Sequence, residues 1–210
     1  DGALQQLPKR SNFAALYPQI EGGDTGINQL ALHVQGEAGQ LTLDGQPVSF
    51  PNPHRARACG VTAVYQELSL VPDMTVAENI ILGAETGTTA SLDLEKANRE
   101  ILALSNELKL DVDPRAYIED LSVGAQQRVE LLKALYRDAK LLILDEPTAV
   151  LSPQEVEELF GILRRTKEQG KTIIIITHKL DEVLAVSDEV TVMRDGRSVG
   201  TQETAHVNQR

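Results

Sequence analysis

A short apolar run that ends in two adjacent acids restricts the fold of this chain more than any other feature. The run covers residues 141–144 (Leu-Leu-Ile-Leu), and Asp145 and Glu146 follow it directly. An apolar run without polar alternation is typical of a strand in a parallel sheet that helices cover on both faces. Ligands of such sheets bind beyond the carboxyl ends of the strands. The run therefore predicts an α/β fold with two carboxylates at a ligand-binding edge.

The sequence around this run alternates between strand and helix patterns. Periodicity predicts a helix over residues 153–169, a strand over 172–177, a short helix over 180–186 and a closing hairpin over 190–201. This order predicts a mostly parallel sheet core with an antiparallel β part. Residues 67–120 carry only helical patterns, which indicates an inserted α-helical subdomain. We therefore expect residues 1–210 to form one domain, with its core in residues 121–201.

The helical patterns also show where two helices begin. Thr75 with Glu78 three residues later predicts a capping box at the start of a helix in the inserted lobe. Ser122 predicts the start of a helix that runs to about Arg137. Residues 92–108 predict a further amphipathic helix between these two.

The net charge of the chain disfavours two classes of binding partner, nucleic acids and anionic membrane surfaces. The 210 residues carry a net charge of −11 at pH 7. Nucleic acids and anionic membrane surfaces attract clustered lysine and arginine, so we expect neither to be the main partner. No apolar run approaches the roughly 18 residues that a membrane-spanning helix needs.

The acid pair and one histidine are the first candidates for catalysis. We expect Asp145 to hold Mg²⁺, directly or through water, and Glu146 to polarise an attacking water. His178 follows the predicted strand over residues 172–177, and neighbouring parallel strands would bring it beside the acids. A histidine there can contact a terminal phosphate. Taken singly, each residue has an ordinary alternative explanation as a polar side chain at a strand end.

Three further residues are candidates for binding a nucleotide or its metal. Ser122 and Gly124 open a predicted helix, and the free N–H groups at a helix start bind phosphate oxygens. Gln66 ends a predicted strand, and its amide can reach a metal ion or a water. In isolation, an ordinary N-cap serine and a polar strand end explain these residues better.

Considered together and in order, these segments resemble the nucleotide-binding subunit of ABC transporters over residues 39–201. The matching segments are Tyr65-Gln66-Glu67 with the Q-loop, residues 121–127 with the signature motif, residues 141–146 with the Walker B strand, Ala149-Val150-Leu151-Ser152 with the D-loop, and Thr177-His178 with the H-loop. Ser152 stands where many members of that family carry Asp. Five ordered motifs make a chance match very unlikely. Residues 64–72, 75–80 and 177–183 are similar to the ribose and galactose import branch.

The resemblance implies a P-loop NTPase-like ABC ATPase fold that binds ATP and Mg²⁺ and energises the import of a simple sugar. It implies that Glu146 and His178 are catalytic, and that Asp145 and Gln66 serve Mg²⁺. The signature residues Ser122, Gly124 and Gln126 would contact the ATP of a second cassette in a head-to-tail dimer. Other implied partners are transmembrane permease subunits and, indirectly, a solute-binding protein, but no nucleic acid. The implied location is peripheral, at the cytoplasmic face of the inner membrane.

The phosphate loop of the family, G-x-x-x-x-G-K-[ST], is absent. Its expected place is near residues 21–29, where Ile27 replaces the phosphate-binding Lys and Asn28 the Mg²⁺-binding hydroxyl. Isoleucine cannot supply a positive charge to the phosphates. Residues 1–40 are therefore expected to be a degenerate or abnormal phosphate-loop region. Two hypotheses follow: an ATP-hydrolysing motor, or an impaired cassette that scaffolds or regulates a partner. A cassette protein outside transport is a third, less favoured, alternative.

Overall fold

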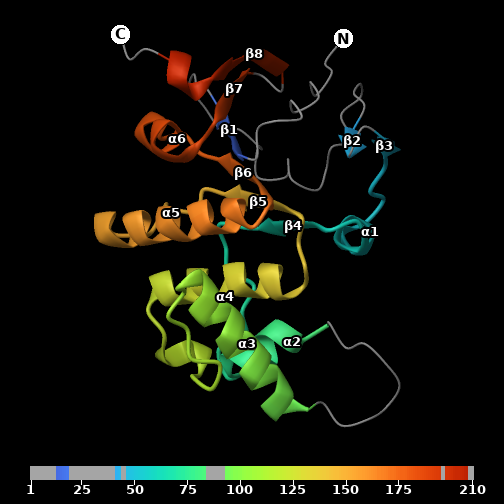
Figure 1. Cartoon of the computed structure of the whole chain (residues 1–210), viewed down its shortest axis with the longest axis vertical. Helices are drawn as coiled ribbons and strands as arrows, with labels where there is room; N and C mark the ends of the chain where they lie inside the picture. Colours follow the sequence, from blue (N-terminus) through green and yellow to red (C-terminus); the bar gives the residue numbers. More distant parts are fainter. Residues whose placement is uncertain (1–12, 19–40, 44–45, 84–92, 195–196, 208–210) are drawn as a thin grey trace.

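A six-stranded sheet forms the centre of the molecule (Figure 1). The computed structural model describes residues 13–18, 41–43, 46–83, 93–194 and 197–207. Neighbouring strands are parallel, except that β8 runs antiparallel to β7. In spatial order the strands are β4 (Val61–Val64), β5 (Leu141–Asp145), β6 (Thr172–Ile176), β1 (Phe13–Pro18), β7 (Glu189–Arg194) and β8 (Arg197–Glu203).

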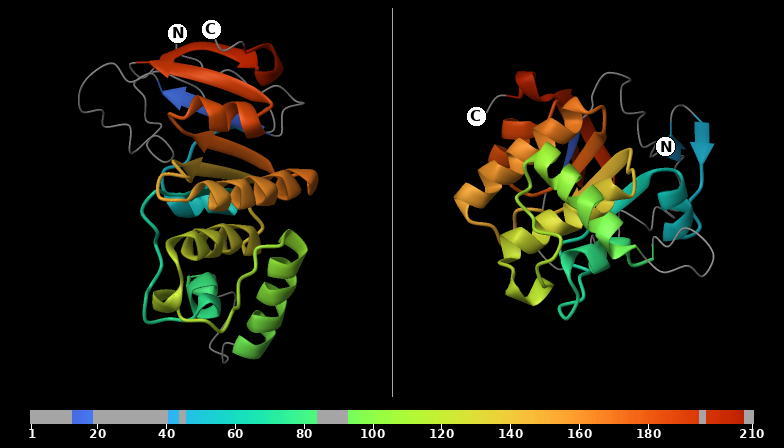
Figure 2. Two further views of the ribbon diagram at one scale, coloured as in Figure 1. Left: turned by 90° about the vertical axis from the view of Figure 1, so that its left-hand side faces the viewer. Right: turned by 60° about the horizontal axis from the view of Figure 1, so that its bottom comes forward.

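Helices cover the sheet and build a separate region at one end of the molecule. Figures 1 and 2 show α2 and α3 at the end opposite to β7 and β8, with α4 between them and the sheet and α5 alongside β4 and β5. The helices are α1 (Pro53–Ala58), α2 (Val76–Ile81), α3 (Leu94–Leu108), α4 (Val123–Tyr136), α5 (Pro153–Glu168) and α6 (Leu180–Val186). Two 3₁₀ turns, η1 (Ile118–Asp120) and η2 (Thr204–His206), and a small antiparallel pair, β2 (Leu41–Leu43) and β3 (Gln46–Val48), complete the described elements.

One hydrophobic core runs from the sheet into the helical end. Leu142 and Leu144 of β5 and Ile173 and Ile175 of β6 are at most 3% exposed, so alternate residues of both strands pack beneath the covering helices. The same core includes Ile80, Ile101 and Leu132 from α2, α3 and α4. The apolar packing is therefore continuous between the sheet and the helical end.

The predicted fold class is confirmed. The apolar run over residues 141–144 lies within a central parallel strand, the carboxyl-terminal hairpin is antiparallel, and residues 67–120 contain α2, α3 and η1. The predicted capping box of Thr75 and Glu78 is present. The strand β1 and the helix α1 were not predicted. Residues 19–40, which include the expected phosphate-loop position, lie outside the described residues.

Candidate functional site

The carboxyl ends of β5 and β6 bring Glu146 and His178 together. Asp145 is in register with Ile176, so the residue after β5 lies beside the residues after β6. The Glu146 N–H donates to the carbonyl of Ile176 at 2.9 Å. His178 Nδ1 lies 2.7 Å from Glu146 Oε1. The predicted proximity of this histidine to the acid pair is therefore confirmed for Glu146.

Glu146 has an unusual backbone and an unsatisfied oxygen. Its φ is 45°, in the left-handed region, where a residue with a Cβ is strained. Its Oε2 is buried and has no hydrogen-bond partner among the described residues. Buried side-chain oxygens normally accept at least one hydrogen bond. The geometry thus leaves one carboxylate oxygen without a donor among the described residues, while His178 contacts the other.

Asp145 lies beside Glu146 in a half-buried position. Burial raises the pKa of the Asp145 carboxyl above its ordinary value, and the charge of Glu146 raises it further. Carboxylate oxygens are the donors that Mg²⁺ prefers, and this cation usually takes one or two carboxylates from a protein and the rest of its shell from phosphates and water. The Asp145 carboxylate at the end of β5 fits such an ion as one of its protein ligands.

The burial of Asp145 and its repulsion by Glu146 lead to a prediction about stability. Because the pKa of the Asp145 carboxyl is raised, the folded state favours its protonated form. The contribution of this carboxyl to the free energy of unfolding is therefore complete at low pH and is lost as pH rises through the folded-state pKa. Asp145→Asn mimics the protonated form. We therefore expect urea unfolding to give a higher free energy of unfolding for the variant than for wild type at pH 7, and a difference that shrinks toward pH 4. Asp73→Asn, at an exposed position, controls for the change in net charge. An advantage that does not vary with pH would contradict this explanation.

A polar network joins Thr148, which follows the acid pair in the sequence, to the segment that follows β6. Thr148 is 1% exposed, and its hydroxyl donates to the Glu182 carboxylate at 2.7 Å. Lys179 Nζ donates to the Thr148 carbonyl at 3.2 Å and forms an ion pair with Glu182 at 3.0 Å. Thr177 Oγ1 also donates to Glu182, at 3.4 Å. This network joins the segment after β5 to the segment after β6, and sequence reasoning did not identify it.

The signature residues open α4, as predicted. Ser122 is the N-cap, and its Oγ accepts from the Ala125 N–H at 3.2 Å. Gln126 Nε2 donates to the carbonyls of Ile118 and Leu121, at 3.2 and 3.1 Å. The amide nitrogen of Gln126 therefore orders the loop that precedes α4. Among the described residues, no hydrogen bond or ion pair joins Ser122 to Glu146 or His178.

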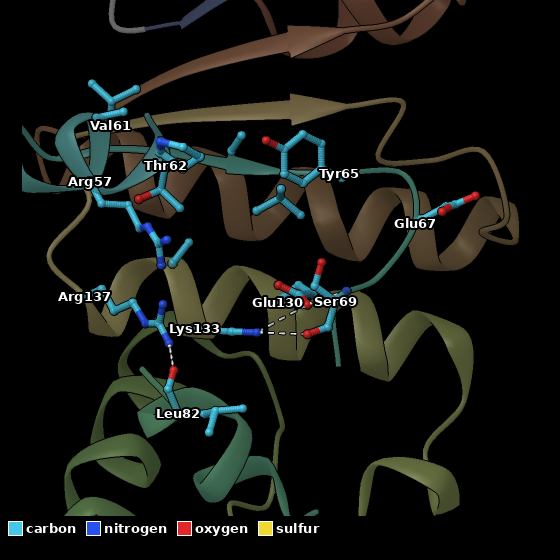
Figure 3. Close-up of a pocket in the computed structure, with 15 residues that line it drawn as sticks. Arg57, Val61, Thr62, Tyr65, Glu67, Ser69, Leu82, Glu130, Lys133 and Arg137 are labelled. Atoms are coloured by element: carbon cyan, nitrogen blue, oxygen red, sulfur yellow. Dashed lines mark hydrogen bonds and ion pairs between the residues drawn. The ribbon is translucent and has the colours of Figure 1, made fainter. Parts of the chain in front are cut away.

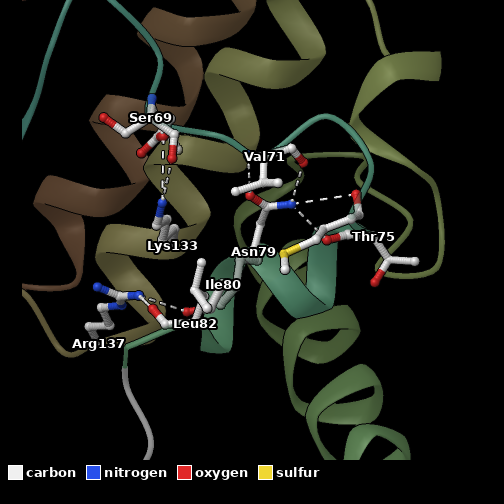
Figure 4. Close-up of polar contacts among 10 residues, drawn as sticks. Ser69, Val71, Thr75, Asn79, Ile80, Leu82, Lys133 and Arg137 are labelled. Carbon is white, nitrogen blue, oxygen red and sulfur yellow. Dashed lines mark hydrogen bonds and ion pairs between the residues drawn. The ribbon is translucent and has the colours of Figure 1, made fainter.

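Gln66 follows β4 and is exposed, and the loop after it is firmly held (Figure 4). The Ser69 N–H donates to Glu130 Oε1 at 2.8 Å, and Lys133 Nζ donates to the Ser69 carbonyl at 3.1 Å. Asn79 of α2 bonds to both the N–H and the carbonyl of Val71. The loop thus connects the end of β4 to α4 and to the helical end of the molecule.

A pocket of about 360 Å³ lies between α1, β4 and α4 (Figure 3). Its charged lining residues are Arg57, Lys133 and Arg137, which are basic, and Glu67 and Glu130, which are acidic. Arg137 donates to the carbonyls of Ile80 and Leu82, and its buried Nε has no partner among the described residues. Burial lowers the pKa of the Arg137 guanidinium, and the charge of Arg57 lowers it further. Three basic and two acidic side chains leave the lining with an excess of one positive charge, in a chain whose net charge is −11.

Comparisons with known proteins agree with this arrangement. The family model described as ABC transporter matches residues 22–149. Nucleoside import ATP-binding protein NupA of Lactococcus lactis subsp. cremoris is 45% identical over 198 residues, which are 94% of this chain and 39% of the relative. Ribose import ATP-binding protein RbsA 1 of Rubrobacter xylanophilus is 44% identical over 182 residues, which are 85% of this chain and 36% of the relative. The chain thus spans less than two fifths of these curated relatives.

A solved structure shares the fold. It is a bacterial ABC transporter cassette solved as a dimer, with a TM-score of 0.72 and 19% identity, and the match covers 93% of this chain and 87% of that one. The family model matches more than half of the 210 residues. The sheet order, the strand-end acids and this match together show that the chain belongs to the ABC transporter family.

Proposed function

We propose that the chain is the ATP-binding and ATP-hydrolysing part of an importer for a simple sugar. The observation that carries the proposal is the pairing of Glu146 with His178 at the carboxyl ends of adjacent parallel strands, with one Glu146 oxygen left free. The relatives described above are named for import of ribose and of nucleosides, which contain a sugar. A nucleoside importer is the second candidate, favoured by the 45% identity to NupA.

Each residue of the site has a distinct task in this proposal. Glu146 Oε2 accepts a hydrogen bond from the attacking water and withdraws its proton, while His178 holds Oε1 and approaches the terminal phosphate. Asp145 and Gln66 would hold Mg²⁺, which when bound would neutralise charge on the phosphates. Ser122, Gly124 and the N–H groups at the start of α4 would contact the nucleotide of a second cassette. Gln126 supports them by ordering the preceding loop.

The alternative is a cassette that binds a partner without hydrolysing ATP, because Ile27 and Asn28 replace the residues of the usual phosphate loop. Binding of ATP with Mg²⁺ and release of phosphate by the purified chain distinguish the two. Measurable turnover supports the motor. A chain that neither binds nor hydrolyses millimolar ATP would contradict the proposed activity and leave the scaffolding role.

We also propose that the basic pocket receives an acidic segment of a transmembrane permease subunit, which would place the chain peripherally at the cytoplasmic face of the inner membrane. Among the described residues, no helix is long and apolar enough to cross a membrane. The pocket adjoins the loop after Gln66, so a partner seated there would contact the connection between β4 and α2. Among the described residues, the Arg57 guanidinium forms no hydrogen bond or ion pair, which leaves its charge available for a carboxylate.

Charge reversal in the pocket tests this docking site. We expect Arg57→Glu to weaken association with the permease subunits about tenfold or more, because like charges would face each other. Arg55→Glu on the same helix is the matched control, since Arg55 does not line the pocket. Co-purification from detergent extracts, with the affinity measured by titration, gives the result. Equal loss in both variants would show that only the overall charge matters.

A further inference from the structure

Glu155 of α5 lies against the first turn of α4. A Cβ added to Gly124 would lie 2.8 Å from Glu155 Cδ and still closer to Oε1, a separation that real Cβ atoms essentially never show. Gly124 has a helical backbone that any residue can adopt, so its conformation does not require glycine. The carboxylate of Glu155 occupies the space that a side chain at residue 124 would need.

The Glu155 side chain is also held in place. Its Oε2 accepts from the Ser152 N–H at 2.9 Å and from Ser152 Oγ at 2.8 Å, which forms the capping box of α5. These bonds lower the pKa of the Glu155 carboxyl. The carboxylate therefore cannot turn away from Gly124 without losing its bonds to Ser152. An ion pair between Arg128 and Glu158, at 3.3 Å, joins α4 and α5 a second time.

Two backbone hydrogen bonds lie within residues 146–151. The Ala149 N–H donates to the Glu146 carbonyl at 3.1 Å, and the Leu151 N–H donates to the Thr148 carbonyl at 3.3 Å. Thr148 is itself fixed by Glu182. The residues between the strained Glu146 and the start of α5 thus form one compact segment. Figures 1 and 2 show α4 and α5 side by side, so this segment ends directly against α4.

We propose that Glu155 is a positioning residue that locks the segment of residues 147–152 to the first turn of α4. The effect of this contact on ATP turnover rests on the proposed function. If Glu146 serves the nucleotide of its own chain and Ser122 that of a second cassette, the contact between Glu155 and Gly124 makes the two sites move together. Gly124 is then required for packing within the chain, in addition to any approach to phosphate.

A double-mutant cycle on unfolding in urea tests the contact itself. Gly124→Ala is expected to raise the unfolding equilibrium constant about tenfold, because the added methyl group displaces Glu155 from its cap. In a Glu155→Ala background the methyl group has room, so the same change is expected to have no effect or to stabilise the helix. Gly161→Ala is the matched control, since the nearest atom to its Cβ would be 3.4 Å away, on Arg165. Additive effects of Gly124→Ala and Glu155→Ala on the free energy of unfolding would show that the two residues are not in contact.

Turnover of ATP tests the positioning role. We expect Glu155→Ala to lower kcat about fivefold or more, with the Kd for ATP and Mg²⁺ nearly unchanged, and Glu155→Gln, which keeps an acceptor for Ser152, to restore most of it. Unchanged kcat in Glu155→Ala would overturn the role even where the unfolding cycle shows coupling. A wild-type chain without turnover would contradict the proposed function instead, and the unfolding cycle would still decide whether the contact exists.

Discussion

Replacing Glu146 with Gln is expected to lower ATP turnover by about two to four orders of magnitude, which is the usual contribution of a general base. Glutamine has nearly the same shape and can still contact His178. It cannot take a proton from water, however, and its amide offers only one acceptor oxygen. Binding of ATP should persist, because the change leaves Asp145 and the backbone in place. Phosphate release under saturating ATP and Mg²⁺ measures the loss, and nucleotide titration measures the binding.

Glu157→Gln is the control for this substitution. Glu157 is an exposed carboxylate on α5, and its removal changes the net charge by the same amount. We expect the control to turn over at the wild-type rate. Turnover by Glu146→Gln at the rate of the control would show that Glu146 does not act as the base. Loss of ATP binding together with turnover would instead show that the residue supports the nucleotide site.

The sequence is most informative where the chemistry depends on strand order. The run before Asp145 predicts a buried parallel strand, and parallel strands end at one edge, so the proximity of His178 to the acids follows from the pattern alone. The signature helix is equally predictable, because Ser122 is a good N-cap before an apolar pattern. These inferences need only local periodicity and the geometry of a sheet.

Contacts between elements that are distant in the sequence could not be predicted from local patterns. Ser152 and Glu155 have the spacing of a capping box, but no local rule indicates that Glu155 fills the space at Gly124. The helix α1 had a visible signal, since Asn52 caps it and Pro53 occupies its first turn. The strand β1 had a weaker one. Its position between β6 and β7 depends on pairing across more than 150 residues, which periodicity cannot reveal.

Asn79 is a further residue whose importance only the structure shows. It lies in a helix with apolar neighbours, where its sequence context suggests little, yet it is 1% exposed. Its Oδ1 accepts from the Val71 N–H at 2.7 Å, and its Nδ2 donates to the carbonyls of Val71 and Thr75, at 3.1 and 3.0 Å (Figure 4). One side chain therefore ties the loop after Gln66 to α2.

Truncation of this side chain, Asn79→Ala, is expected to lower the free energy of unfolding by about 2–3 kcal/mol. The change removes the four hydrogen bonds of this side chain, including a longer one of 3.4 Å to the Met74 carbonyl, and leaves a polar cavity, while partial exposure of Val71 lets water replace some of the lost bonds. Urea unfolding at neutral pH measures the effect. Asn106→Ala, an exposed asparagine on α3, is expected to cost less than about 0.5 kcal/mol. Equal effects in the two variants would show that the loop is held by Glu130 and Lys133 alone, and that Asn79 does not connect the end of β4 to the helical end of the molecule.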